Sequence, residues 1–189
     1  MIVTQNTQNL LSAAQEAGKN GLPPVHLWNP PFCGDLDMRI ARDGTWFHEG
    51  TPIGRPAMVR LFSTILRKDG DKYFLVTPVE KVGITVEDVP FIAVDFERDG
   101  SGRDQRVTFV TNVGDRVTAG PDNPLRLAEA GGEPVPYVLV RDGLEARIDR
   151  KSFYRLIEIG SHADHDGASW FGLWSDGLFF PLIPSADLT

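Results

Sequence analysis

The sequence has few cysteines, few lysines and no long apolar run. Its single cysteine, Cys33, excludes an internal disulfide and a zinc site built from cysteines. No stretch approaches the roughly 18 consecutive apolar residues of a membrane-spanning helix. The N-terminal residues have neither a cationic start nor the apolar core of a secretory signal. We therefore expect a cytoplasmic protein with no membrane partner.

Basic residues are also outnumbered. The 19 Lys and Arg residues face 26 Asp and Glu residues, for a formal net charge of -7. Nonspecific affinity for duplex nucleic acid comes mostly from Lys and Arg, so this balance argues against such a partner. Fourteen of the basic residues are Arg and five are Lys. Arg suits two-point contacts with phosphate or carboxylate, although a GC-rich genome also gives such an excess.

The N-terminal region combines a helix with a proline-rich segment. Residues 7–17 have the apolar spacing of a short helix, with Thr7 as the N-cap. Four prolines between residues 23 and 31 each fix φ and remove a backbone donor, which predicts a stiff, extended chain. Apolar residues in this segment, including Trp28, favour an arm laid along the protein. We interpret 1–34 as a helix followed by a proline-rich arm.

One local pattern occurs twice. The stretch "MRIARDGTWF" begins at Met38 and "VLVRDGLEAR" begins at Val138, and each predicts a strand, an Arg-Asp-Gly turn and a second strand. A stretch with helical spacing follows in each case, over 55–70 and 149–160. Shared order and shared Arg-Leu spacing in the two helices favour a duplication over a common turn used twice.

The predicted copies are strand-turn-strand-helix-strand units at 35–83 and 133–183. Residues 84–100 and 106–117 are rich in Val, Ile, Phe and Thr and predict further strands. The region 84–189 would then be an antiparallel sheet with a helix that contains the second copy. This order of elements predicts an α+β fold.

Several motifs resemble a known bacterial family. The block "PPVHLWNPPFCGDLDMRIARDGTWFHEGTPIGRPAMVRLF", with "LVTPVEK" and "VEDVPF" further on, is similar to domain of unknown function family 1285. The Trp-Asn-Pro-Pro and Asp-Gly-Thr-Trp elements, at 28–31 and 43–46, are its most distinctive parts. The resemblance implies a duplicated core and a C-terminal part similar to pleckstrin-homology folds. It implies no reaction or cofactor, but a nucleotide-like ligand at the interface of the two halves and a role in signal transduction.

Polar residues on the predicted strand at 35–41 form the first candidate site. Asp35, Asp37 and Arg39 alternate with apolar residues, so we expect them on one face of the strand. His48 follows on the return strand. Such a group can carry out general acid-base chemistry, and it can equally be a ladder of cross-strand ion pairs.

Aromatic and Arg side chains form the second candidate site. The tryptophans can stack on a planar base (Trp28, Trp46, Trp170 and Trp174). Trp28 and Trp46 are favoured because polar residues surround them. Arg39, Arg55 or Arg150 would hold a phosphate. The last two lie at predicted helix starts, where a cation is unfavourable unless a ligand anion or an Asp side chain is close.

The segment "SHADHDG" at 161–167 is the third candidate. His162, Asp164, His165 and Asp166 are residue types that bind divalent metals. The competing interpretation is a solvated loop, since Asp and Gly are ordinary turn residues. No serine-nucleophile elbow, phosphate-binding loop or dinucleotide fingerprint is present.

The sequence therefore predicts a non-enzymatic binding or signalling protein without a cofactor. Its ligand would be a small anionic, nucleotide-like molecule held between the two halves. The first alternative is a metal-dependent hydrolase that uses His162–Asp166. The second is an interaction module in which the proline-rich arm docks a partner or another copy of the chain, giving a homo-oligomer.

Overall fold

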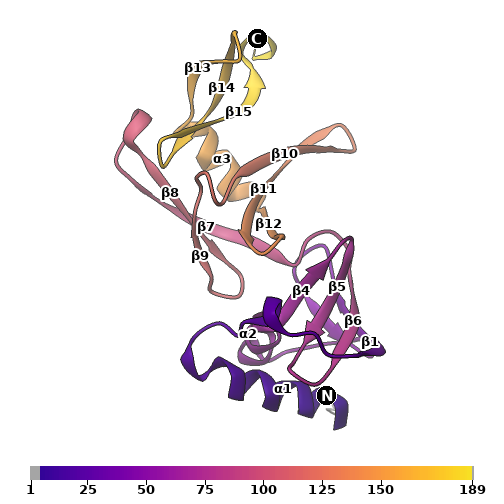
Figure 1. The fold of residues 1–189 in the computed structure, drawn as a ribbon. Coiled ribbons are helices and arrows are strands. Elements are labelled where there is room, and N and C mark those ends of the chain that lie inside the picture. Colours follow the sequence, from indigo (N-terminus) through magenta and orange to yellow (C-terminus); the bar gives the residue numbers. More distant parts are fainter. Residues whose placement is uncertain (1–4, 189) are drawn as a thin grey trace. The chain divides into compact units, whose positions relative to one another are not determined.

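The computed structural model describes residues 5–188. The chain divides into two compact halves, an N-terminal half up to Pro90 and a C-terminal half from Phe91. Strands predominate among the described residues, together with three α-helices, so the predicted α+β class is confirmed (Figure 1). No helix between residues 5 and 188 is long and apolar enough to cross a membrane.

The N-terminal half contains one six-stranded sheet. Its elements are α1 (Gln5–Ala17), the 3-10 turns η1 (Gly18–Asn20) and η2 (Val25–Leu27), β1 (Phe32–Ile40), β2 (Trp46–His48), β3 (Thr51–Pro52), α2 (Pro56–Thr64), β4 (Leu66–Asp69), β5 (Lys72–Val76) and β6 (Lys81–Val86). The strand order is β3-β2-β1-β6-β5-β4. The pair β1 and β6 is parallel and the other pairs are antiparallel.

The core of this half lies where β1 and β2 meet α2. Met38 and Ile40 are buried and alternate with the partly exposed Arg39, as the period of a strand requires. The Trp46 ring of β2 stacks on Phe62 of α2, with ring centroids 6.2 Å apart and planes 13° apart. The apolar residues on one face of β1 and β2 and those on one face of α2 therefore pack into the same core.

The C-terminal half contains two sheets. Its elements are β7 (Phe91–Asp99), η3 (Gly102–Asp104), β8 (Arg106–Thr111), β9 (Arg116–Thr118), β10 (Leu125–Ala130), β11 (Glu133–Arg141), β12 (Leu144–Ile148), α3 (Arg150–Glu158), β13 (Ser161–His165), β14 (Ala168–Ser175), β15 (Leu178–Pro184) and η4 (Ser185–Asp187). The larger sheet has the order β10-β11-β12-β7-β8-β9, with β12 parallel to β7. The smaller sheet is the antiparallel meander β13-β14-β15.

Buried side chains join the two sheets of the C-terminal half. The Ser175 hydroxyl accepts a hydrogen bond from the Val107 amide at 2.9 Å and donates to the Ala119 carbonyl at 2.7 Å. The Gln105 amide donates through Nε2 to the Trp174 carbonyl at 2.8 Å. Ser175 and Gln105 are buried, so these bonds hold β14 against β8, β9 and the end of η3 without a shared backbone ladder.

The duplication is present as a repeated order of elements. The series β1-β2-α2-β4-β5-β6 of the first half matches β11-β12-α3-β13-β14-β15 of the second, with the short β3 added in the first. The two series end differently. In the first, β6 returns to pair with β1, whereas in the second β15 pairs only with β14 among the described residues, and β10 lies beside β11.

Several local predictions are wrong. The helix predicted over 55–70 ends at Thr64, and Leu66–Asp69 forms β4, because pairing with β5 supplies its backbone partners. The predicted loop at 161–167 is β13 and a turn, since β13 pairs with β14. The boundary predicted after residue 83 falls inside β6.

Thr7 does not cap α1. The helix already includes Gln5, so Thr7 lies inside it and is fully buried. Its hydroxyl lies 3.3 Å from Nε2 of His48 on β2. Thr7, which the sequence predicted as a helix cap, therefore connects α1 to β2 through a buried hydrogen bond.

Candidate functional site

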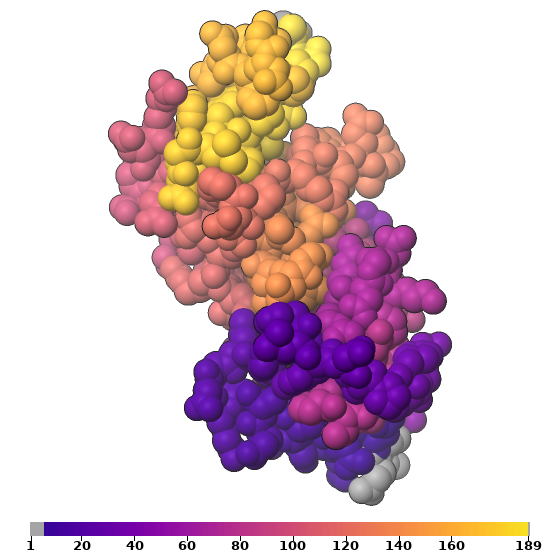
Figure 2. Space-filling model, viewed as in Figure 1, coloured from indigo at the N-terminus to yellow at the C-terminus, as the bar shows by residue number. Residues whose placement is uncertain are grey.

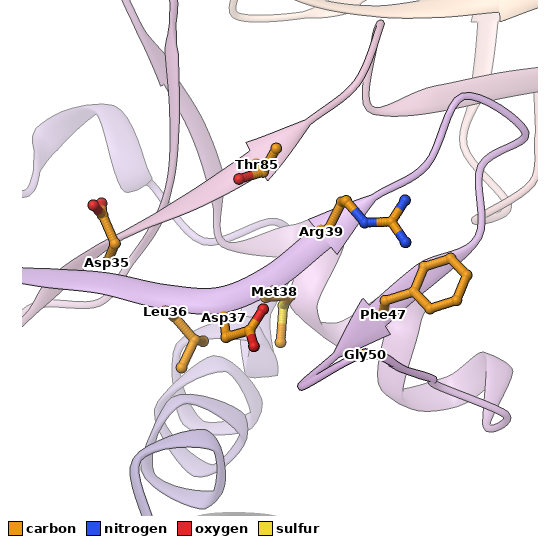
Figure 3. Close-up of a pocket in the computed structure, with 8 residues that line it drawn as sticks. All are labelled: Asp35, Leu36, Asp37, Met38, Arg39, Phe47, Gly50 and Thr85. Atoms are coloured by element: carbon orange, nitrogen blue, oxygen red, sulfur yellow. The ribbon is translucent and has the colours of Figure 1, made fainter.

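A cavity of about 400 Å³ opens beside β1 in the N-terminal half (Figure 3). It is lined by Asp35, Leu36, Asp37, Met38, Arg39, Phe47, Gly50 and Thr85. Three residues of the first sequence candidate, Asp35, Asp37 and Arg39, are thus gathered at one cavity. β2 pairs with β1 over Met38–Ile40, and the Glu49 amide then donates to the Asp37 carbonyl at 3.0 Å.

The two aspartates of this cavity do not share a face of β1. Figure 3 shows their side chains leaving the strand on opposite sides, which corrects the sequence prediction. The reason is an irregularity in the pairing with β6 between Asp35 and Arg39. Asp35 instead lies over Gly83 of β6, where a Cβ atom would be 2.2 Å from its Oδ1.

The charge of Arg39 is already compensated. Its Nη1 donates to Glu87 Oε1 at 2.5 Å, and its guanidinium lies 4.3 Å from the Phe47 ring centroid. The carboxylates of Asp35 and Asp37 are exposed and have no ion pair in the part of the chain that the structure describes. The cavity is therefore acidic on balance, and its geometry does not support an anion held by Arg39.

Two other predicted ligand residues, Trp46 and His48, belong to the core. Trp46 is 1% exposed and stacks on Phe62, so no ring face is available to a ligand. His48 is 2% exposed, and its ring contacts the Thr7 hydroxyl beneath α1. Their polar neighbours in the sequence do not surround them in space.

Trp28 is half-buried, and its backbone is held by a charged cluster on β4. Arg67 Nη1 donates to the carbonyls of Val25 at 2.9 Å and Trp28 at 2.7 Å. The same guanidinium donates to both carboxylate oxygens of Asp69, which also accepts from Lys81 Nζ at 2.8 Å. The Arg67 hydrogen bonds, followed by those of Lys81, lower the pKa of Asp69 against the opposing effect of burial. Part of the proline-rich segment is thereby fixed to the edge strand.

The two Arg residues at helix starts have different surroundings. Arg55 immediately precedes α2, is exposed and has no carboxylate partner among the described residues. Arg150 is the first residue of α3 and pairs with Glu133 at 2.9 Å, while Asp149 caps the helix by accepting from the Ser152 amide. Protein carboxylates therefore stabilise the start of α3. Of the two sequence-based explanations for an Arg at this position, a ligand anion or a nearby Asp side chain, the structure shows a protein carboxylate.

The third sequence candidate does not form a metal cluster. His162 and Asp164 are exposed on one face of β13 and His165 is on the other, as strand alternation requires. His162 Nδ1 lies 2.8 Å from the Ser185 hydroxyl, and His165 lies 3.4 Å from Asp166. Within residues 5–188, no three His, Cys, Asp or Glu side chains are grouped so as to hold a metal ion.

A second cavity, of about 420 Å³, lies in the C-terminal half and was missed in the sequence. It is lined by Gly102, Arg103, Ser161, His162, Ala163, Asp164 and Trp174. The Arg103 guanidinium lies 4.7 Å from the centroid of the Trp174 ring. The hydrogen bond from Gln105 to the Trp174 carbonyl holds η3 against β14 and so positions this pair. Arg103 is exposed and has no carboxylate partner among residues 5–188.

The sequence predicted a ligand site that combines an Arg with a Trp, but it proposed Arg39, Arg55 or Arg150 and favoured Trp28 and Trp46. Trp174 was one of four candidate tryptophans, whereas Arg103 carried no local signal. The two residues are 71 positions apart, and only the docking of β14 on η3 brings them together.

Comparison with known families agrees with the division into halves. Residues 23–89 match the N-terminal domain of the domain of unknown function DUF1285, and residues 90–182 match its C-terminal domain. The chain belongs to the DUF1285 family. The boundary between these matches, after residue 89, lies one residue from the boundary between the two halves, after Pro90.

Two solved DUF1285 structures are similar to this chain. A family protein from Silicibacter pomeroyi DSS-3 is 62% identical over 95% of this chain and 97% of its own, with a TM-score of 0.86. A second, from Shewanella baltica OS155, is 28% identical over 65% of this chain and 91% of its own, with a TM-score of 0.53. No match was found among curated proteins.

Proposed function

We propose that this DUF1285 protein is a non-enzymatic ligand-binding or signalling protein that takes a small anionic molecule, with nucleotides as the first candidates. One observation carries the proposal: Arg103 lies over Trp174 in an open cavity and has no carboxylate partner among the described residues. This combination supplies a charge for an anionic group and an aromatic surface beside it.

The physical argument rests on the difference between Arg103 and Arg39. A guanidinium makes strong two-point hydrogen bonds with phosphate or carboxylate. Arg39 already pairs with Glu87, so an anion would have to displace a carboxylate there. Arg103 needs no such exchange. A volume of about 420 Å³ is also within the range of small-molecule sites.

The finer sequence predictions remain proposals. We keep the signalling role and the cytoplasmic location as proposals. A likeness of the C-terminal part to pleckstrin-homology folds is supported by the run β7–β12 followed by α3. The metal-dependent hydrolase receives no support from the arrangement of His162 and His165.

A second candidate function has an observation in its favour. The proline-rich arm exposes Leu27 (73%) and Leu22 (56%), and Phe32 (58%) is exposed at the start of β1. Figure 2 shows the corresponding indigo part of the chain on the surface of the N-terminal half. Exposed apolar groups of this kind often mark contacts with other proteins. Docking of a partner, or of another copy of the chain, is therefore the alternative proposal.

The test uses the full chain and two matched substitutions. Thermal shift and calorimetric titration with AMP, ATP and inorganic phosphate should detect binding, since a ligand at 100 times its Kd stabilises by about 2.7 kcal/mol. We expect Arg103→Gln to weaken binding about tenfold, consistent with the loss of one charge-assisted contact. Arg98→Gln, which removes the same charge at an exposed position of β7 that lines neither cavity, should have no effect. Equal binding by Arg103→Gln and the wild type, or no binding of any probe, would refute the proposal.

A further inference from the structure

β13 (Ser161–His165) is an edge strand. Among residues 5–188, it pairs with β14 and with no other strand. Four consecutive residues of β13, Ser161–Asp164, line the second cavity. Consecutive side chains of a strand point to opposite faces, so four in a row line one cavity when that cavity follows the edge of the strand. The cavity therefore follows β13 over most of its length and extends to Trp174 of β14.

The two edges of this small sheet are protected differently. β15, on the other edge, contains Pro181 and Pro184, which have no N–H to offer to an added strand. β13 contains neither proline nor lysine, the residues that commonly block an exposed edge. An added strand is therefore favoured at β13 and disfavoured at β15.

The first copy of the duplicated series has an edge strand at the corresponding position, which a neighbouring segment covers through a side chain. β4, the counterpart of β13, is also an edge strand. A proline-containing segment lies against it, because Arg67 of β4 donates to the backbone carbonyls of Val25 and Trp28. No backbone hydrogen bond joins β13 to a segment other than β14 among the described residues.

We propose that β13 accepts an extended acidic peptide as an added strand, with a peptide carboxylate paired to Arg103. The proposal rests on the anion binding proposed for Arg103 and assigns that anion to a peptide. Backbone hydrogen bonds along the edge would provide affinity, and the Arg103 contact would fix the register. The four lining residues correspond to about 13 Å of strand, so the peptide needs at least about four residues.

The test uses fluorescein-labelled hexapeptides of alternating valine and threonine, each with one glutamate at a different position. We expect fluorescence polarisation to show binding that is lost when alternate peptide amides are N-methylated, because N-methylation removes the donors of an added strand. Arg103→Gln should weaken binding about tenfold, and Arg98→Gln, at an exposed position outside both cavities, should leave it unchanged. Hydrogen exchange at the amides of Ser161–His165 should slow when the peptide is bound.

The outcomes separate this inference from the proposed function. Peptide binding that survives N-methylation, or that leaves exchange at β13 unchanged, overturns strand addition. If AMP, ATP or phosphate binds through Arg103 and no hexapeptide binds, the proposal of a peptide ligand is wrong and the proposed function still holds. If neither peptides nor small anions bind, both proposals are wrong.

Discussion

Replacing Ser175 by alanine should destabilise the C-terminal half strongly. The Ser175 hydroxyl bonds to the Val107 amide and the Ala119 carbonyl, and the serine is completely buried. Alanine removes both bonds and leaves two backbone groups without partners and out of reach of water. Each unsatisfied group costs roughly 1–3 kcal/mol, so we expect Ser175→Ala to lower the free energy of unfolding by about 2–6 kcal/mol.

Urea unfolding followed by far-UV circular dichroism measures this loss. The control is Ser169→Ala, which removes an exposed hydroxyl whose one hydrogen-bond partner among residues 5–188 is the Ser185 hydroxyl. This control should change the free energy of unfolding by no more than about 0.5 kcal/mol. A loss below about 1 kcal/mol in Ser175→Ala, or equal losses in both variants, would refute the argument that this hydroxyl joins the two sheets.

Three further predictions concern other parts of the fold. Because the pKa of Asp69 is lowered in the folded protein, its carboxylate adds stability that is present at neutral pH and lost as the pH falls through that pKa. Asp69→Asn should therefore lower the urea midpoint at pH 7 and flatten its decline below about pH 4; an unchanged decline would contradict this. Phe62→Ala should cost about 3–5 kcal/mol and shift the emission of Trp46 to the red, because it removes the ring stacked on that indole. Gly172→Ala should cost at least about 1–3 kcal/mol in urea unfolding, because its Cβ would lie 2.2 Å from the Phe180 carbonyl oxygen; a wild-type midpoint would contradict it.

The elements that the sequence predicts well are those with a strong local signal. The alternation of Met38 and Ile40 and the Arg-Asp-Gly turn determine the first hairpin, and the second copy repeats them. The end of α2 could not be predicted in this way, because Leu66 is compatible with both a helical stripe and a buried strand. Pairing with β5, a tertiary interaction, decides between them.

The sequence locates the candidate sites less well than the fold. Asp35 and Asp37 were correctly placed together at β1, but the irregular pairing with β6 sends them to opposite sides. Trp46 and His48 were chosen for their polar neighbours, although burial depends on which strand face the helices cover. No local sequence pattern marked Arg103 as a site residue, because its partner Trp174 belongs to β14, a strand of the smaller sheet that is far away in the sequence.

The different endings of the two copies have a consequence for how the chain can vary. In the first half, the last strand of the meander is part of the main sheet because it lies beside β1. In the second half, the meander β13-β14-β15 shares no backbone ladder with the larger sheet. It is held by buried apolar side chains such as Leu173 and by the Ser175 and Gln105 side chains. A backbone hydrogen bond from the Asp176 amide to the Gln105 carbonyl adds to these contacts. Its outward surface can therefore diverge between relatives while the sheet that carries it stays the same.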